Sequence, residues 1–357
     1  MSSNGNPCIL YGELYTKYKS EIISEVISKT NIEKNKLKHS KQNDVIIPCS
    51  GETAVDIAVA RCVPFDNVLL GGDLNIIRLH KYDGAFMAYQ LNSKRKIEIA
   101  KLAQGVSVVH LYGENLKSIN TFNPSLQEQQ KIVRLLSLLD ERIKVQNKII
   151  EDLKKLKSAI SKQVFTQEPN GWSRLDTLFS KGKAGGTPTS TNKEYYNGEI
   201  PFLSINDITK QGKYVRYTEN HLSQSGLENS SAWIVPKYSL IMSMYASVGL
   251  VTINEIPTTT SQAMFAMQLK DKGLLDYLYY YLSFFKYHYI HKYLETGTQS
   301  NINADIIRGI MIPTYGHSRN MEIASTLQGF DAKIDNELSV LELFNRQKNY
   351  LLSQMFI

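Results

Sequence analysis

The sequence predicts an α+β protein in which two α/β lobes alternate with two long α-helices. Two segments carry apolar residues at the spacing of a coiled-coil helix, and each follows short β-rich runs punctuated by glycine and proline. The two halves of the chain also align with each other at a shift of about 191 residues. We therefore expect an internal repeat with pseudo-two-fold symmetry, in which the long helices pack antiparallel as a coiled coil.

Composition sets limits on the class of protein. The 357 residues are 42% hydrophobic, which is enough for two domains with full cores, and the net charge of +7 permits a nucleic-acid partner without requiring one. The three cysteines, Cys8, Cys49 and Cys62, form no CxxC pair, so we expect a reducing cytoplasm and no metal site. Neither a membrane span nor a secretory signal is recognisable, which favours a soluble, cytoplasmic protein.

The first lobe is assigned to residues 1–122. A strand that enters a loop is expected at 7–15, and further β-rich runs are expected at 44–48, 56–60 and 74–79. A helix is expected from about 84 to 103, where Gly105 ends it, and it carries a basic cluster at 94–96. The first long helix, residues 123–166, follows; Pro124 suits its first turn because proline has no N–H to lose there. Its predicted seam is Ile132, Leu136, Leu139 and Ile143.

The second lobe, residues 167–319, repeats this order. Strands are expected at 201–205, 238–252 and 263–269, and a helix at 274–294 ends before Gly297. Tyrosines and phenylalanines crowd that helix, and their helical spacing favours core packing over base stacking. The second long helix, residues 320–357, has its seam at Ile323, Leu327, Phe330 and Ile334. The repeat aligns Asp140 with Asp331.

This architecture suggests a protein that recognises two binding sites at a fixed separation. Two similar lobes on a stiff helical spacer suit two similar sites, and duplex DNA offers them because its grooves repeat every ~34 Å. Two diverged lobes would then read two different half-sites. The alternative is a two-lobed coiled-coil scaffold that binds only proteins.

Several motifs carry a resemblance to a known family. The string GGTP at 185–188, followed by EYYNGEIPF at 194–202 and NDI at 206–208, resembles the start of a target recognition domain in the specificity subunits (HsdS) of type I restriction–modification systems. TGTQSNI at 296–302 and IMIP at 310–313 resemble the end of that domain, and PSLQEQQ at 124–130 resembles the entry to its helix. The first half lacks the GGTP-like opening segment, so its recognition domain is expected to be N-terminally short.

The resemblance implies a subunit without a catalytic centre. Its two recognition domains would each read half of a bipartite DNA site, and its paired helices would dock two adenine-N6 methyltransferase (modification) subunits. A restriction subunit, a translocase and nuclease, could join them. No cofactor is expected in this chain; S-adenosylmethionine, ATP and Mg would belong to the partners.

The residues themselves favour the non-catalytic reading. The sequence holds neither the Asn/Asp-Pro-Pro-aromatic motif of adenine methyltransferases nor a GxxxxGK[ST] phosphate loop. A stand-alone methyltransferase is therefore the weaker rival.

Residue chemistry indicates candidate DNA contacts, because Lys and Arg bind phosphates while Gln, Asn, Arg, Ser and aromatic residues reach base edges. Each could equally be an ordinary solvated side chain. The second lobe offers Lys181, Lys183, Arg216, Tyr245, Gln299 and Asn301. The first lobe offers Tyr11, Ser50, Lys94 and Arg95.

Overall fold

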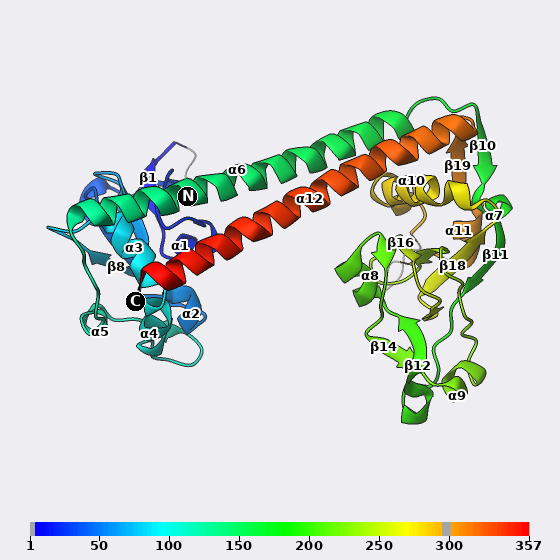
Figure 1. Ribbon diagram of the computed structural model, residues 1–357, viewed down its shortest axis with the longest axis horizontal. Helices are drawn as coiled ribbons and strands as arrows, with labels where there is room; N and C mark the ends of the chain where they lie inside the picture. Colours follow the sequence, from blue (N-terminus) through cyan, green and yellow to red (C-terminus); the bar gives the residue numbers. More distant parts are fainter. Residues whose placement is uncertain (1–3, 295–300, 357) are drawn as a thin grey trace. The chain divides into compact units, whose positions relative to one another are not determined.

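The computed structural model describes residues 4–294 and 301–356. The chain forms two compact units, residues 1–150 with 336–357 and residues 151–335 (Figure 1). Each unit joins one lobe to one end of both long helices. We refer to residues 4–125 as lobe 1 and to the described part of 166–316 as lobe 2.

The two long helices are α6 (Leu126–Phe165) and α12 (His317–Met355). Ser125 lies at the start of α6, where its Oγ accepts a hydrogen bond from Glu128 N at 3.4 Å. Pro124 thus stands just before the helix and not in its first turn, which corrects the expectation from the sequence. The second helix begins three residues earlier than expected.

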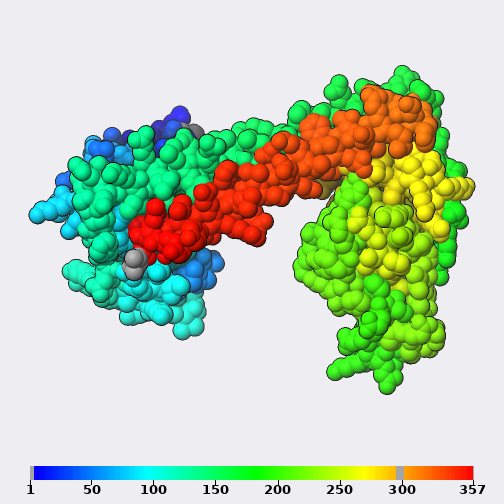
Figure 2. Space-filling view, viewed as in Figure 1, coloured from blue at the N-terminus to red at the C-terminus, as the bar shows by residue number. Residues whose placement is uncertain are grey.

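Within each unit the two helices run antiparallel. In the first unit Lys348 on α12 pairs with Asp140 on α6, while the earlier residue Glu337 contacts the later residue Gln146. In the second unit Lys157 on α6 pairs with Asp331 on α12. Figure 2 shows the surfaces of both helices side by side in each unit.

Lobe 1 is built from short strands and helices. The strands are β1 (Asn6–Ile9), β2 (Ser28–Thr30), β3 (Lys38–His39), β4 (Asp44–Pro48), β5 (Ser50–Gly51), β6 (Arg61–Val63), β7 (Leu69–Leu70), β8 (Leu74–Ile77) and β9 (Val109–His110). The helices are α1 (Glu13–Thr16), α2 (Ala54–Ile57), α3 (Gly84–Asn92), α4 (Arg95–Lys101) and α5 (Gly113–Leu116), with one 3₁₀ turn, η1 (Lys34–Lys36).

Lobe 2 has longer strands. They are β10 (Gly171–Arg174), β11 (Phe179–Ala184), β12 (Tyr196–Leu203), β13 (Tyr214–Val215), β14 (Asn220–Leu222), β15 (Leu240–Ser243), β16 (Val251–Asn254), β17 (Thr259–Thr260), β18 (Met264–Leu269) and β19 (Met311–Thr314). The helices are α7 (Leu175–Leu178), α8 (Ile205–Gln211), α9 (Gln224–Glu228), α10 (Leu275–His288) and α11 (Ala304–Gly309), with 3₁₀ turns η2 (Lys193–Tyr195), η3 (Lys272–Leu274) and η4 (Ile290–Lys292).

The lobes share one sheet pattern. In lobe 1 the central strand β4 pairs antiparallel with β6 and β8, and in lobe 2 the central strand β15 pairs antiparallel with β16 and β18. Parallel pairs also recur, β1 with β7 and β12 with β17. Among the residues described, lobe 1 has no counterpart of β10, α7 and β11, the segment that in lobe 2 precedes the shared pattern.

Three sequence-based assignments differ from the structure. Residues 56–60 were expected as a β-run, but residues 54–57 form helix α2, which Thr53 caps by accepting from Asp56 N at 3.2 Å. The helix expected at 84–103 is broken at Ser93 into α3 and α4. The helix expected at 274–294 ends at His288 and is followed by η4.

The core of lobe 2 lies between its five-stranded sheet and α10. Buried residues of β15 and β18, among them Leu240 and Phe265, share a hydrophobic cluster with Tyr277, Leu278 and Phe285 of α10. The helical spacing therefore correctly predicted a core role for much of this aromatic run. None of the helices in the described chain combines the length and apolar character that crossing a membrane requires.

Candidate nucleic-acid interface and its supporting junctions

Two of the predicted basic residues of lobe 2 lie on the edge strand β11. Lys181 and Lys183 are exposed at alternate positions of the strand and therefore share one face. Lys181 Nζ is 4.2 Å from the centroid of the Trp233 ring, and Lys183 Nζ donates to the carbonyl oxygen of Ser231 at 3.3 Å. Both ammonium groups thus lie beside the segment 231–233, where they remain open to an anionic partner.

The glycine pair that follows β11 is required by close packing. A Cβ on Gly185 would lie 2.0 Å from the carbonyl oxygen of Thr260, and one on Gly186 would lie 2.3 Å from the backbone nitrogen of Ala232. The backbone itself supplies the contacts here, since Gly186 N donates to Thr260 O at 2.9 Å. The glycine pair of the GGTP motif therefore allows close backbone packing, which fixes the end of β11 against residues 232 and 260.

The structure gathers three of the predicted lobe 2 residues at one end of the sheet. Lys183 comes near the end of β11, and Tyr245 follows the end of β15, whose partner β18 begins at that same end. Asn301 is adjacent, because the next residue, Ile302, donates to Met244 O at 3.1 Å. Tyr245 is exposed.

Two further lobe 2 predictions do not join this group. Arg216 follows β13, which runs parallel to β16, so it lies at the opposite end of the sheet. There its Nε pairs with Glu255 Oε2 at 2.7 Å. Gln299 lies outside the described residues.

The predicted residues of lobe 1 differ in exposure and in their partners. Tyr11 is exposed, whereas Ser50 is buried and donates to Asp73 Oδ2 at 3.1 Å. Lys94 is exposed at the break between α3 and α4, and Arg95 pairs with Glu98 at 2.8 Å. Ser50 is therefore poorly placed to touch a ligand through its side chain.

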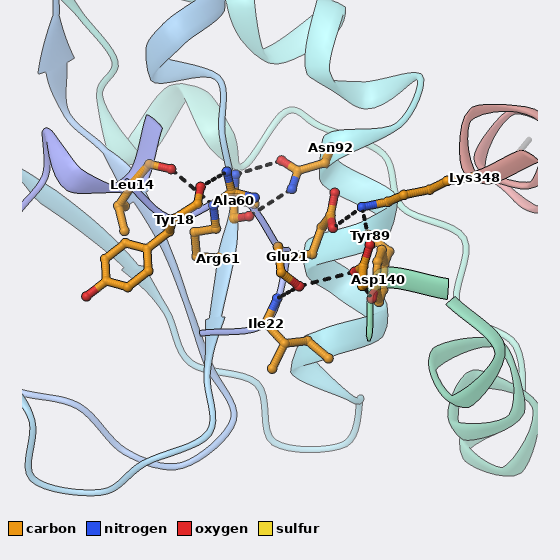
Figure 3. Close-up of polar contacts among 11 residues, drawn as sticks. Leu14, Tyr18, Glu21, Ile22, Ala60, Arg61, Tyr89, Asn92, Asp140 and Lys348 are labelled. Atoms are coloured by element: carbon orange, nitrogen blue, oxygen red, sulfur yellow. Dashed lines mark hydrogen bonds and ion pairs between the residues drawn. The ribbon is translucent and has the colours of Figure 1, made fainter. Parts of the chain in front are cut away.

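Sequence reasoning missed a polar junction that attaches lobe 1 to the long helices. Tyr89 of α3 donates to Asp140 Oδ2 of α6 at 2.6 Å, and Lys348 of α12 pairs with both Asp140 and Glu21 at 2.6 Å (Figure 3). The side chains of Lys348 and Asp140 are only 13% and 11% exposed. Burial lowers the pKa of Lys348, but Glu21 and Asp140 more than offset this and raise it above its usual value.

Arg61 fixes the lobe 1 segment that carries Glu21. Its Nε donates to Leu14 O at 3.1 Å and its Nη2 to Tyr18 O at 2.7 Å, deep in the lobe (Figure 3). Burial lowers the pKa of this guanidinium, while the nearby carboxylates Glu21 and Asp140 oppose that shift. The junction is thus held on the lobe side by backbone carbonyls as well as by charge.

Lobe 2 has the matching junction at its own end of the helices. Tyr280 of α10 donates to Asp331 Oδ2 of α12 at 2.6 Å, and Lys157 of α6 pairs with Asp331. Tyrosine, aspartate and lysine each recur 191 residues apart, at 89 and 280, 140 and 331, and 157 and 348. The sequence did align the aspartates, and the same shift would have found the tyrosines and lysines.

The predicted seam residues are buried to different degrees. Leu136, Ile323 and Leu327 are at most 4% exposed, and Leu139 and Ile334 are also buried, while Ile132, Ile143 and Phe330 are partly exposed. Leu136 packs against Phe86 and Tyr89 of lobe 1, and Ile323 and Leu327 pack into the core of lobe 2. The seam therefore serves the lobes as well as the helix pair.

A cavity adjoins each junction. In the first unit a space of about 660 Å³ lies between residues 17–27 and the two long helices, with Asp140, Lys144 and Lys348 among its lining. In the second unit a space of about 440 Å³ is lined by Lys213, Tyr280 and Asp331, among others. These spaces leave one side of each junction open to water.

Comparison with protein families gives a match over both halves of the chain. Residues 2–155 and 169–342 each match the family model described as type I restriction modification DNA specificity domain. One copy therefore covers lobe 1 with most of α6, and the other covers lobe 2 with much of α12.

Curated relatives resemble parts of the chain. The MjaIX specificity subunit of a type I restriction enzyme from Methanocaldococcus jannaschii is 27% identical over 178 residues, 48% of this chain and 40% of that protein. The HindI specificity subunit from Haemophilus influenzae is 32% identical over 113 residues, 31% of this chain and 24% of that protein. The chain thus matches less than half the length of either relative.

Solved structures support the fold. The S subunit of a type I restriction–modification system from M. genitalium has a TM-score of 0.58 at 18% identity, covering 99% of this chain and 92% of its own. A chain from a structure on complex assembly and conformational transition of the type I R-M system has a TM-score of 0.59 at 18% identity, covering 89% and 83%. At this identity the likeness concerns the fold.

Proposed function

The chain belongs to the type I restriction–modification DNA specificity family, and on that premise we propose that it is the sequence-recognition subunit of such a complex. Each lobe would read one half of a bipartite site in duplex DNA. The base pairs between the two halves would remain unread.

The observation that carries this proposal is the recurrence of one frame with different surface residues. Both lobes hold a central strand between two antiparallel neighbours, and both attach to the helices through a Tyr–Asp–Lys junction. A rigid frame that presents variable loops is the usual arrangement of recognition proteins. Two such lobes in one chain fit two half-sites better than one continuous site.

The chemistry would belong to partner subunits. We propose that this chain is non-catalytic and that two modification subunits bring S-adenosylmethionine, while a restriction subunit brings ATP and Mg. Because its target would be chromosomal DNA, the assembly would act in the cytoplasm.

An exposed apolar stripe on α6 supports docking of a protein partner. Leu135, Leu138, Val145 and Ile149 are each 39–52% exposed. Their spacing places them on one side of the helix, where the basic residue Arg142 accompanies them. A contiguous exposed apolar patch of this kind is typical of a protein-interaction surface.

The proposal is tested by selecting duplexes from a random-sequence library with the complex of this chain and its modification subunits. We expect two conserved blocks of bases separated by a spacer of fixed length. These blocks should persist as salt is raised. Added salt reduces the free energy that counterion release contributes to the phosphate contacts, whereas the preference for particular bases is carried by the base contacts. Binding that shows no sequence preference and vanishes with salt would favour the protein-only scaffold.

A further inference from the structure

The same backbone frame ends the central strand of each lobe. In lobe 1 Cys49 N donates to Asp73 O at 2.7 Å, and Cys49 O accepts from Leu111 N at 2.7 Å. In lobe 2 Met244 N donates to Ala263 O at 2.7 Å, and Met244 O accepts from Ile302 N at 3.1 Å. In each lobe, therefore, the residue that follows the central strand is held by hydrogen bonds on both sides, and an exposed loop lies beside it.

In lobe 1 a short, pinned loop, residues 104–110, lies beside this point, because it leads into Leu111 and its β9 strand pairs with β5, the strand that follows Cys49. Gln104 and His110 exchange two backbone hydrogen bonds of 2.9 and 2.7 Å, and these close the loop at its base. Gly105 has φ of +121°, and a Cβ there would lie 2.2 Å from Val108 O. Glycine is therefore needed to make the loop this tight.

This pinned loop holds apolar side chains out in water. Residues 104–108 are all exposed, and Val106 is 98% exposed while Val108 is 53% exposed. Because the Val106 side chain is exposed at the tip of this loop, it contributes no hydrophobic burial to the folding of lobe 1. Such a side chain suits an apolar contact with a partner, and among base edges the thymine methyl group offers one.

In lobe 2 a different segment lies at this point, the turn that directly follows Met244, and it is strained. Ala246 and Ser247 follow Tyr245 with φ of +40° and +53°, values that cost non-glycine residues free energy. Buried Ser243 holds the turn, since its Oγ donates to Ser247 O at 2.8 Å and accepts from Leu250 N at 2.9 Å. The turn is thus rigid and presents three exposed residues, Tyr245 to Ser247.

We propose that these two loops are the base-reading elements of the two lobes. Val106 contacts a thymine methyl group in the half-site of lobe 1, and Tyr245 contacts bases in the half-site of lobe 2. The inference rests on the proposed function and specifies which surface of each lobe meets DNA.

The test compares variants of the full complex in the library selection. Val106→Ser should weaken the preference for one A·T pair in one half-site by roughly fivefold or more and leave the other half-site unchanged. Tyr245→Ala should alter the other half-site only. Ile32→Ser and Tyr217→Ala replace residues that are also exposed, 50% and 56%, and should change neither.

A chemical variant of the DNA makes the test sharper. Replacing that thymine by uracil removes only the methyl group, so wild-type binding should fall about as much as it does in Val106→Ser. The two changes combined should cost no more than either alone. A bipartite motif that all four variants select unchanged would overturn this inference and leave the proposed function standing, whereas failure of the wild type to select any motif would overturn the function itself.

Discussion

Gln146 of α6 bonds to Glu337 of α12, the residue that the 191-residue repeat places in the equivalent position. Its Nε2 donates to the backbone carbonyl of Glu337 at 3.0 Å and also to the Glu337 carboxylate, and both side chains are buried. When two repeat-related helices pack antiparallel about a pseudo-two-fold axis, a residue near that axis contacts the equivalent residue of the other helix. Here the two equivalent residues are a glutamine amide in α6 and a glutamate carboxylate in α12.

The Gln146–Glu337 pair allows a test of the helix packing. Gln146→Leu should lower the free energy of unfolding by about 1–3 kcal/mol, because the buried carboxylate loses a donor. The double variant with Glu337→Leu should recover most or all of that loss, since a leucine pair fits a helix seam. Chemical unfolding of both variants measures this, and a double variant less stable than the single one would contradict the assigned contact.

The lobe 1 junction predicts a second effect. Lys348→Met leaves Asp140 and Glu21 buried without their shared cation, so we expect a loss of about 3–5 kcal/mol. Arg346→Met, two residues earlier, removes a cation whose partner Glu342 is largely exposed, and it should change stability little. Equal unfolding midpoints for the two variants would show that the junction does not hold the lobe.

Glycines predict effects of opposite sign. Gly185→Ala should destabilise lobe 2, because its Cβ would meet Thr260 O at 2.0 Å. Gly329→Ala, on an exposed stretch of α12 with nothing within 4 Å of the added Cβ, should stabilise the protein by roughly 0.5–1 kcal/mol through helix propensity. Thermal unfolding of the two variants distinguishes them, and a Gly185→Ala protein as stable as wild type would refute the close packing.

Two partly buried tyrosines of the second unit predict a loss of stability in alkali. Burial, reinforced by Asp276 and Asp331 respectively, raises the pKa of Tyr214 and of Tyr279 to about 12. The unfolded pKa is about 10, so the folded state holds these protons more tightly, and the stabilisation is complete below pH 10 and lost between pH 10 and 12. Melting temperatures measured from pH 8 to 12 should fall above pH 10, and they should fall less steeply in the double variant Tyr214→Phe/Tyr279→Phe than in the wild type. The same dependence of melting temperature on pH in both proteins would contradict these assignments.

The long helices could be predicted from sequence because their signal is periodic and sustained. Short elements carry less information. Residues 57–60 are apolar and read as a strand, yet Thr53 and Asp56 at cap spacing make 54–57 a helix. The expected helix at 84–103 breaks after Asn92, whose side chain bonds to the backbone of Ala60 at 2.8 and 2.9 Å. Such a long-range bond leaves no local pattern in the sequence.

The candidate interface was predictable only in part. Residue type suggested Lys183, Tyr245 and Asn301, and the fold brings them to one end of a sheet. Residue type also suggested Ser50, which is buried, and Arg216, which pairs with Glu255. It passed over Val106, because an apolar residue is a binding candidate only when the fold leaves it exposed.

We propose that this chain directs adenine methylation to a bipartite site. The most direct measurement maps N6-methyladenine in cells that express the modification subunits with and without this chain. We expect a two-part methylated motif with a fixed spacer that disappears when the chain is absent. Methylation of the same motif without the chain would contradict the account.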